Sequence, residues 1–276
     1  MSTLLCGAFV MAWLLATSAP AAASAGDQTP AAPVAAQQPP ASERGWRTEA
    51  QVGVDHEGLS NGYGTWRNLS LEITRKTSQR RAWYAGVRDT TRFSLHDRAL
   101  VGGVYHPLSK RVTGMVEVEL SPSHHVVPRW ALVGWADASL GRGWVVNAGV
   151  RHRRYDAATV NLLNIGAERY VGAYRLVYTA YVGHLVGGGT SGSHLARAGR
   201  LYGRDQSNFV GVSVSAGNEL EHIGAPGFLR TSVLAISLSG RHWVTSRWAV
   251  VYNAGVHEQG TLYIRTGGTA GLRYRF

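Results

Sequence analysis

The chain has 276 residues, a single cysteine and a formal net charge of +11. A basic balance can indicate a nucleic-acid-binding protein, but here the arginines are spread along the whole chain and alternate with apolar residues instead of gathering in one patch. We therefore expect no nucleic-acid partner, and we expect an anionic lipid or polysaccharide surface as the neighbour of this chain.

The first 25 residues predict a cleaved signal peptide. Leu4 to Ala16 form an apolar run that is too short to span a bilayer as a helix, and Ala23-Ser24-Ala25 supplies the small residues of a cleavage site. Cys6 follows the bulky Leu5 and has no apolar region before it, which argues against lipid attachment. Cleavage would remove the only cysteine, so the exported chain could form no disulfide.

Residues 26–45 are rich in Ala, Pro and Gln and hold almost no large apolar side chain. Such a composition buries too little surface to offset the entropy of ordering, so it predicts a disordered leader. The folded part is then 46–276, which is long enough for one large β domain.

Short segments of alternating apolar and polar residues fill this folded part, at a spacing of roughly sixteen residues, and they are separated by Gly, Asn, Asp, Ser or Pro. Examples in chain order are 112–120, 144–153, 210–216 and 248–257. In the second of these, Trp144, Val146, Ala148 and Val150 share one face, while Asn147, Gly149, Arg151 and Arg153 share the other. The pattern predicts an all-β domain of about 14 strands. Twelve or sixteen stay open because Ala99–His106 and His194–Tyr202 are weakly patterned.

Two architectures fit such strands, a soluble sandwich and a transmembrane antiparallel up-and-down β-barrel. The apolar faces hold Ala, Val and Leu but little Phe, which suits contact with lipid. Aromatic residues cluster at segment ends, as interfacial girdles do. They are Trp46, Trp66, Trp83, Trp130, Trp144, Tyr170, Tyr174, Tyr202, Trp243 and Trp248. The sequence therefore predicts a membrane barrel.

Connection lengths provide a separate test, since such barrels have tight turns at one end and longer loops at the other. The expected tight turns are Thr77–Gln79, Leu108–Lys110, Gly141–Gly143, Val171–Ala173, Gly203–Gln206 and Thr245–Arg247. The expected long loops include Gly58–Gly64, Ser121–Val127, Val186–Ser193 and Gly217–Gly227. This parity predicts that both ends of the barrel domain lie on the periplasmic side.

The last residues, GLRYRF, place Leu272, Tyr274 and Phe276 on one face. This ending resembles the C-terminal strand signature of bacterial outer-membrane barrels. The resemblance implies that the barrel-assembly machinery binds the Phe276 strand.

Several stretches resemble the YaiO family of outer-membrane β-barrel proteins, in family order. They are LSNGYGTW (59–66), SHHVVPRW (123–130), GVRHRRYD (149–156), IGAERYVGAYRLVY (165–178), VSVSAGNELE (212–221), SGRHWVTSRWAV (239–250) and GLRYRF (271–276). The resemblance implies a Gram-negative outer-membrane barrel in contact with membrane lipids and lipopolysaccharide. It also implies an envelope role connected with surface polysaccharide.

The stretch HEGLSNG (56–62) is similar to a string found in outer-membrane lipid hydrolases, where the histidine precedes the serine by two residues. Here His56 and Ser60 are four apart, which places them roughly 13 Å apart in an extended chain and out of reach for proton transfer. The competing interpretation is a hairpin loop in which Ser60, Asn61 and Gly62 are turn residues. A lipid hydrolase using His56 and Ser60 stays open as an alternative.

His124-His125 suggests a metal site, but adjacent strand residues point to opposite faces and no third ligand is near in sequence. A solvated loop is the preferred interpretation, and we expect no metal and no cofactor. The basic run Arg151 to Arg154 suggests an anion site, but the preferred interpretation is two lumen-facing arginines paired with carboxylates on other strands, followed by a basic strand end.

Strand parity predicts a polar network that faces the lumen. Its members are Glu49, Asp55, Glu72, Glu117, Glu119, Arg151, Arg153, Arg175, Arg273 and Arg275. Interleaved acids and bases would form ion pairs that plug the barrel, whereas a permeation pathway needs one sign to dominate a constriction. We therefore expect a structural or accessory barrel without catalysis, and a narrow passive channel for small anionic solutes is the alternative.

Overall fold

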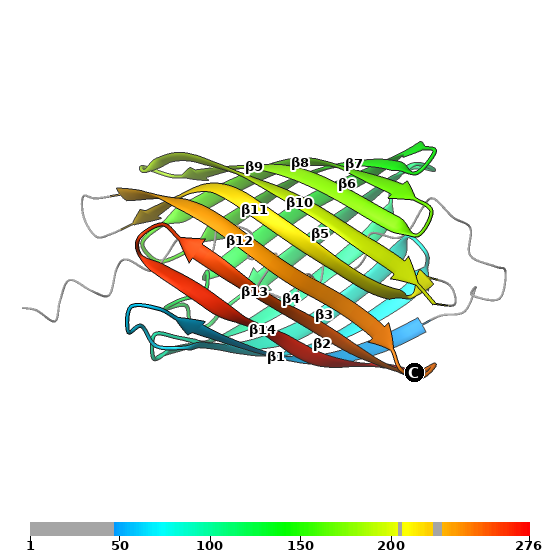
Figure 1. Cartoon of the computed structure of the whole chain (residues 1–276), viewed down its shortest axis with the longest axis horizontal. Helices are drawn as coiled ribbons and strands as arrows, with labels where there is room; N and C mark the ends of the chain where they lie inside the picture. The colour runs from blue at the N-terminus through cyan, green and yellow to red at the C-terminus, as the bar shows by residue number, and fades with distance from the viewer. Residues whose placement is uncertain (1–46, 204–205, 223–227) are drawn as a thin grey trace, which may run out of the picture.

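The computed structural model describes residues 47–203, 206–222 and 228–276, which form a closed antiparallel β-barrel (Figure 1). Each strand pairs with the next along the chain, and β14 pairs with β1 to close the ring. The strands are β1 (Arg47–Leu59), β2 (Trp66–Ser78), β3 (Arg81–Arg92), β4 (Leu95–Pro107), β5 (Val112–Leu120), β6 (Trp130–Gly141), β7 (Trp144–Arg154), β8 (Thr159–Val171), β9 (Tyr174–Leu185), β10 (Gly189–Tyr202), β11 (Asn208–His222), β12 (Phe228–Trp243), β13 (Trp248–Gln259) and β14 (Tyr263–Arg275). The predicted fold class is confirmed, with fourteen strands rather than twelve or sixteen. The expected signal peptide and leader lie outside the described residues.

The alternation of the sequence sets the two faces of the wall. In β1 the side chains of Glu49, Gln51 and Asp55 are buried, whereas Val52 and Val54 are 42% and 55% exposed. Full transfer of a valine or leucine side chain from water to hydrocarbon contributes about 1.5–3 kcal/mol, and these half-exposed side chains gain a corresponding part of it in lipid. The outer face is therefore built for lipid and the inner face for polar contacts. Within the described ranges, no helix has the length and apolar character needed to cross a membrane.

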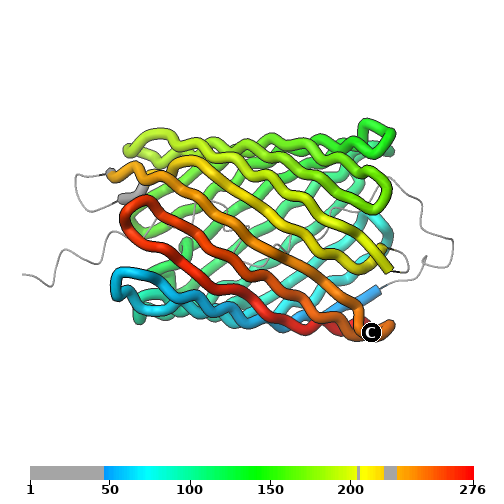
Figure 2. The backbone as a smooth tube through the Cα atoms, in the orientation of Figure 1, coloured from blue at the N-terminus to red at the C-terminus, as the bar shows by residue number. Residues whose placement is uncertain are grey.

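The closing seam joins the first strand to the last. Its register runs from Glu49 opposite Arg275 to Leu59 opposite Arg265, and the backbone N–H of Phe276 adds a bond to the Thr48 carbonyl at 3.0 Å. Arg47 and the C-terminus consequently lie at the same end of the barrel (Figure 2). We call this the terminal end, and we call the opposite end the loop end.

The connections differ in part from the expected lengths. Those at the terminal end are short, as predicted, for example 79–80, 142–143 and 172–173. At the loop end 60–65 and 121–129 are long, but the prediction of a long loop over Val186–Ser193 is wrong because β10 begins at Gly189, opposite Leu185. The prediction for Gly217–Gly227 is wrong over its first half, since β11 continues to His222. Small residues there suggested loops, but their backbone groups complete the strand ladder.

The expected aromatic girdle is confirmed only in part. Trp83, Trp144 and Trp248 are 45%, 46% and 46% exposed and lie where their strands begin at the terminal end. Trp66 is 2% exposed, so its assignment to the girdle is wrong. It begins β2 on the inward parity of that strand and therefore enters the lumen.

Candidate functional site

The lumen at the terminal end is organised around the buried carboxylate of Glu49. Its oxygens lie 3.7 Å from Lys76 Nζ, 3.4 Å from Arg273 Nη1 and 3.2 Å from Arg275 Nη2. Arg273 also donates from Nε to Gln51 Oε1 at 2.7 Å. These contacts tie β2 and β14 to β1, so one carboxylate is shared by three cations, two of which, Arg273 and Arg275, reach it across the closing seam.

A second cluster at the terminal end joins β8 to β9. Arg175 donates from Nε and Nη2 to the two oxygens of Glu168, each at 2.9 Å, and Tyr170 adds its hydroxyl at 3.1 Å. The paired geometry is that of a bidentate arginine–carboxylate bond, which is among the stronger polar contacts in proteins.

Three further predicted acids line the lumen between β2 and β5. Glu117 accepts a hydrogen bond from the Tyr84 hydroxyl, and Glu119 accepts one from Arg88 Nη1 at 3.2 Å. Glu72 accepts from Thr74 at 3.0 Å. Arg88, which was not among the predicted residues, supplies the only cation in these three contacts.

Asp55 lies nearer the loop end and is held by neutral donors. Asn68 Nδ2 donates to it at 2.7 Å, Thr269 donates through its hydroxyl, and Thr90 donates to Asn68 at 2.9 Å. The two remaining predicted cations are on β7. Arg153 lines a cavity. Arg151 forms no hydrogen bond or ion pair with any residue in the described part of the chain, so the expected pairing of Arg151 with a carboxylate is wrong.

The structure does not bring His56 and Ser60 together as a catalytic pair. His56 is exposed on the outward parity of β1. Ser60 Oγ accepts a hydrogen bond from the Ile264 backbone N–H at 2.8 Å, and the Ser60 N–H donates to the Ile264 carbonyl at 2.8 Å. Asn61 and Gly62 follow with φ of 63° and 74°, the left-handed backbone of a tight hairpin turn. Their geometry is that of a turn.

The loop 121–129 between β5 and β6 is folded against the barrel, and the expectation of a merely solvated loop is wrong. Asp97 on β4 is fully buried and accepts hydrogen bonds from the Val126 and Val127 backbone N–H groups at 2.6 and 3.0 Å, and its Oδ1 lies 2.9 Å from His125 Nδ1. His124 Nε2 lies 2.9 Å from Asp156. Each histidine thus meets one carboxylate, and the described residues hold no group of three metal-ligating side chains.

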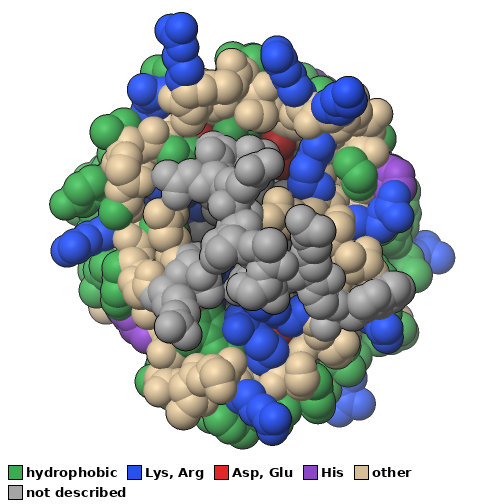
Figure 3. All heavy atoms as spheres, turned by 90° about the vertical axis from the view of Figure 1, so that its right-hand side faces the viewer, with side chains coloured by type: hydrophobic (Ala, Val, Ile, Leu, Met, Phe, Trp, Pro, Cys, Tyr) green, Lys and Arg blue, Asp and Glu red, His purple; other side chains and the backbone are tan. Residues whose placement is uncertain are grey.

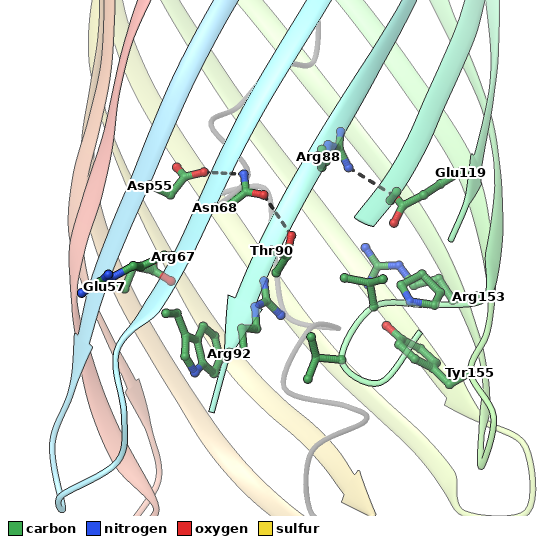
Figure 4. A pocket seen from close by; sticks show the side chains of 15 residues that line it. Asp55, Glu57, Arg67, Asn68, Arg88, Thr90, Arg92, Glu119, Arg153 and Tyr155 are labelled. Carbon is green, nitrogen blue, oxygen red and sulfur yellow. Dashed lines mark hydrogen bonds and ion pairs between the residues drawn. The ribbon is translucent and has the colours of Figure 1, made fainter. Parts of the chain in front are cut away.

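Val126 and Val127 of this loop help to line a cavity of about 100 Å³ inside the loop end (Figure 4). Asp55, Arg88, Arg92 and Glu119 contribute polar groups, and Trp66 forms part of an apolar wall. The Trp66 ring is held edge to face by Phe93 at 5.2 Å and by Tyr263 at 6.2 Å. Rigid aromatic packing and arginines from different strands make this cavity a candidate binding site.

A scan of family models matches residues 47–221 to the YaiO membrane beta barrel domain. The match covers more than half of the chain and includes β1 to β10 and most of β11. The chain belongs to the YaiO family. The family and the closed barrel together make it an outer-membrane β-barrel protein. The resemblance read from the sequence motifs is confirmed.

Solved structures similar to this YaiO-family barrel are distant in sequence. One is an anion-selective porin from Comamonas acidovorans, at 10% identity and a TM-score of 0.48, covering 84% of this chain and 99% of that chain. Another is described as a bacterial polysaccharide outer membrane secretin, at 8% identity and a TM-score of 0.48, covering 84% and 97%. The KdgM porin matches at 7% identity and a TM-score of 0.46, covering 82% and 99%. No curated protein sequence matches the chain.

Sequence reasoning missed several residues of the YaiO-family lumen, among them Glu168, Lys76 and Asp97. Parity alone places Glu168 on the inward face of β8, so that residue could have been found. Parity also places Asp97 on the inward face of β4, but its contacts carry no such signal, because its partners are backbone N–H groups of a loop 29 and 30 residues away in the chain.

Proposed function

We propose that this chain is a structural or accessory barrel of the outer membrane, without enzymatic chemistry, whose lumen is closed or narrow. The observation that carries the proposal is the pairing of inward charges of both signs, in which Glu49 meets three cations and Glu168 meets Arg175. A conducting pathway requires one sign to dominate a constriction, and paired charges oppose that. A link to surface polysaccharide is part of the proposal and rests on the family resemblance.

Conductance tests this proposal directly. The purified chain, inserted into planar bilayers, should show small conductance or none. Large, stable open steps would contradict the closed lumen.

A narrow passive channel for small anionic solutes is the second candidate, and Arg151 is the observation that favours it. This inward cation has no hydrogen-bond or ion-pair partner among the residues of the described strands and loops. If the barrel conducts, its small currents should prefer anions, and Arg151→Glu should abolish or reverse that preference. Currents whose selectivity is unchanged by this substitution would refute the anion channel.

The hydrolase alternative has less support, since His56 faces outward and Ser60 Oγ is held by the Ile264 amide. A nucleophilic serine needs a base within hydrogen-bond reach. We expect purified wild type and Ser60→Ala to be equally inactive on phospholipid and lipopolysaccharide. Hydrolysis by the wild-type protein that is lost in Ser60→Ala would instead support the hydrolase alternative.

We further propose that the chain is exported by a signal peptide and contacts membrane lipids, lipopolysaccharide and the barrel-assembly machinery, the last through the Phe276 strand. Phe276 supports this, since it is 73% exposed at the end of the seam strand. N-terminal sequencing of the protein purified from outer membranes should begin at Gly26. A mature chain that keeps residues 1–25 would rule out the signal peptide.

A further inference from the structure

The cavity at the loop end contains a cation, Arg92, that forms no ion pair with an acidic side chain of the described residues. Arg92, at the end of β3, has its Cζ 4.5 Å from the centre of the Trp66 ring, and it forms no ion pair with a carboxylate of the described residues. The three acids of the lining are otherwise engaged. Asp55 accepts from Asn68 and Thr269, Glu119 accepts from Arg88, and Glu57 lies 3.5 Å from Arg265.

A second arginine lies against the same indole. The Arg265 Cζ is 4.7 Å from the centre of the Trp66 ring, so two guanidinium groups share one aromatic side chain. Cation–π contact stabilises each by about 0.5–1 kcal/mol at exposed sites and by more when it is desolvated. The two like charges repel each other, however, and Glu57 is the only carboxylate that forms an ion pair with either of them in the described part.

Two buried donors at this place also lack an acceptor. Trp66 is 2% exposed and Arg265 is 7% exposed, and neither Trp66 Nε1 nor Arg265 Nε has a hydrogen-bond partner among the residues that the structure describes. The Glu57 carboxylate approaches Arg265 Nε without hydrogen-bond geometry. A buried unsatisfied donor costs about 1–3 kcal/mol, which makes such groups rare unless something else occupies the site.

Size limits what can enter. A cavity of about 100 Å³ has room for about three water molecules at ~30 Å³ each, which suits a single oxyanion better than a whole sugar or lipid. Guanidinium groups bind carboxylate and phosphate oxygens with short, charge-assisted hydrogen bonds. The loop 121–129, fixed by Asp97, keeps Val126 and Val127 against the cavity and limits the water that would screen such a bond.

We propose that the loop-end cavity is a binding site for an oxyanion, a carboxylate or phosphate group that is either free or the end of a larger solute, with Arg92 as its main ligand and Trp66 Nε1–H as a further donor. Figure 4 shows Arg92 reaching into the space between the β1–β3 wall and Tyr155. The site goes beyond the proposed accessory function and does not require that the barrel conducts.

The test is isothermal titration calorimetry on the full folded chain in detergent micelles. The titrant is inorganic phosphate or acetate, and chloride keeps the ionic strength constant. Wild type should bind at least one of the two anions saturably, and Arg92→Gln should weaken that binding about tenfold or more. Trp66→Phe keeps the ring and removes the donor, so it should weaken binding by a smaller factor. The matched control is Arg81→Gln, at the opposite end of the same strand and exposed, which should bind as wild type does.

The two anions distinguish the possible ligands, since preference for phosphate points to a phosphorylated solute or headgroup and preference for acetate points to a carboxylate. Absence of saturable binding of both anions by wild type would overturn the proposal, as would equal binding by Arg92→Gln and Arg81→Gln.

A stability measurement guards against a variant that merely misfolds. Without added anion, Arg92→Gln should unfold at the same temperature as Arg81→Gln or higher, because it removes a cation repelled by Arg265. Phosphate or acetate should raise the unfolding temperature of wild type but not that of Arg92→Gln. A much lower unfolding temperature for unliganded Arg92→Gln would show that Arg92 serves the fold rather than a ligand.

Discussion

The two ends of this barrel use charge in different ways. At the terminal end, cations outnumber acids, and one buried carboxylate, Glu49, contacts three of them, Lys76 on the neighbouring strand and Arg273 and Arg275 across the seam. At the loop end, the buried carboxylate of Asp97 binds backbone N–H groups and fixes a loop. The first arrangement closes the wall of the barrel, and the second shapes its interior. The described part of the terminal end is therefore the structural end, and the loop end, where the loop 121–129 folds inward, is where we propose a ligand site.

The rims differ as well. The described turns at the terminal end hold Arg80, Lys110, Arg111, Arg142 and Arg247 and no acidic residue. Figure 3 views the barrel from this end and shows Lys and Arg side chains around the rim. The described loops at the opposite end hold Arg129 and Asp156 with two histidines. The terminal rim is thus a basic ring, whereas the loop rim has both signs of charge.

The largest effect should follow loss of the Glu49 carboxylate. Glu49→Gln leaves Lys76, Arg273 and Arg275 without their shared counter-charge, and breaking a buried ion pair costs about 3–5 kcal/mol. Because Lys76 is partly exposed, we expect the free energy of unfolding to fall by an amount at the lower end of that range. Urea unfolding of the chain in lipid vesicles would measure this decrease.

Glu72→Gln is the matched control for this substitution. Glu72 faces the same lumen from the neighbouring strand, opposite Gln51, but its hydrogen-bond partner is Thr74. Glu72→Gln should therefore lower the free energy of unfolding by about 1 kcal/mol, the contribution of an ordinary hydrogen bond. Equal losses for the two variants would show that the seam does not depend on the Glu49 cluster.

The Glu49 cluster also shows how far the sequence alone can predict this structure. A period of two places Glu49 on the inner face, because side chains alternate along a strand whatever its neighbours are. It cannot pair Glu49 with Arg273 or Arg275, which lie 224 and 226 residues later and meet it only when the ring closes in one register. The Asp97 contacts were beyond prediction for another reason, since backbone N–H groups of a loop carry no sequence signature.

Removing the charge of Asp97 should have the next largest effect, and this effect should stay local to the loop end. Asp97→Asn weakens the hydrogen bonds to Val126 and Val127, which as charged bonds are worth about 1.5–3 kcal/mol each. The loop 121–129 should loosen while the strands persist, so trypsin should cut after Arg129 in the folded barrel. Asp89→Asn, an exposed carboxylate at the same end that contacts His96 and Arg98, should leave Arg129 protected. Equal cleavage in the two variants would mean that Asp97 does not hold the loop.

A smaller effect should come from the hairpin that was considered as a catalytic site. Gly62 has a φ of +74°, where a Cβ costs about 1–2 kcal/mol, so Gly62→Ala should lower the free energy of unfolding by about 1 kcal/mol. Gly64 lies two residues later, has no positive φ and has open space around it, so Gly64→Ala should be neutral or slightly stabilising. Equal destabilisation by the two substitutions would argue against the turn geometry.

The smallest effect on stability, and the clearest contrast between the ends, should come from the rim charges. Arg111→Gln and Arg129→Gln each remove an exposed arginine and should change the free energy of unfolding by less than about 0.5 kcal/mol.

The rate of folding into phosphatidylglycerol vesicles should distinguish the two variants. We expect the terminal turns to stay on the side from which the chain inserts, where each cation near an anionic surface contributes about 1 kcal/mol. Arg111→Gln should therefore slow association at low salt, whereas Arg129→Gln should not. Because screening shortens such attraction to about 10 Å at 0.1 M salt, the difference should fade as salt is added and be absent with phosphatidylcholine. If both variants slow association alike, the basic ring has no special part in lipid contact, and the difference between the two ends lies in the lumen alone.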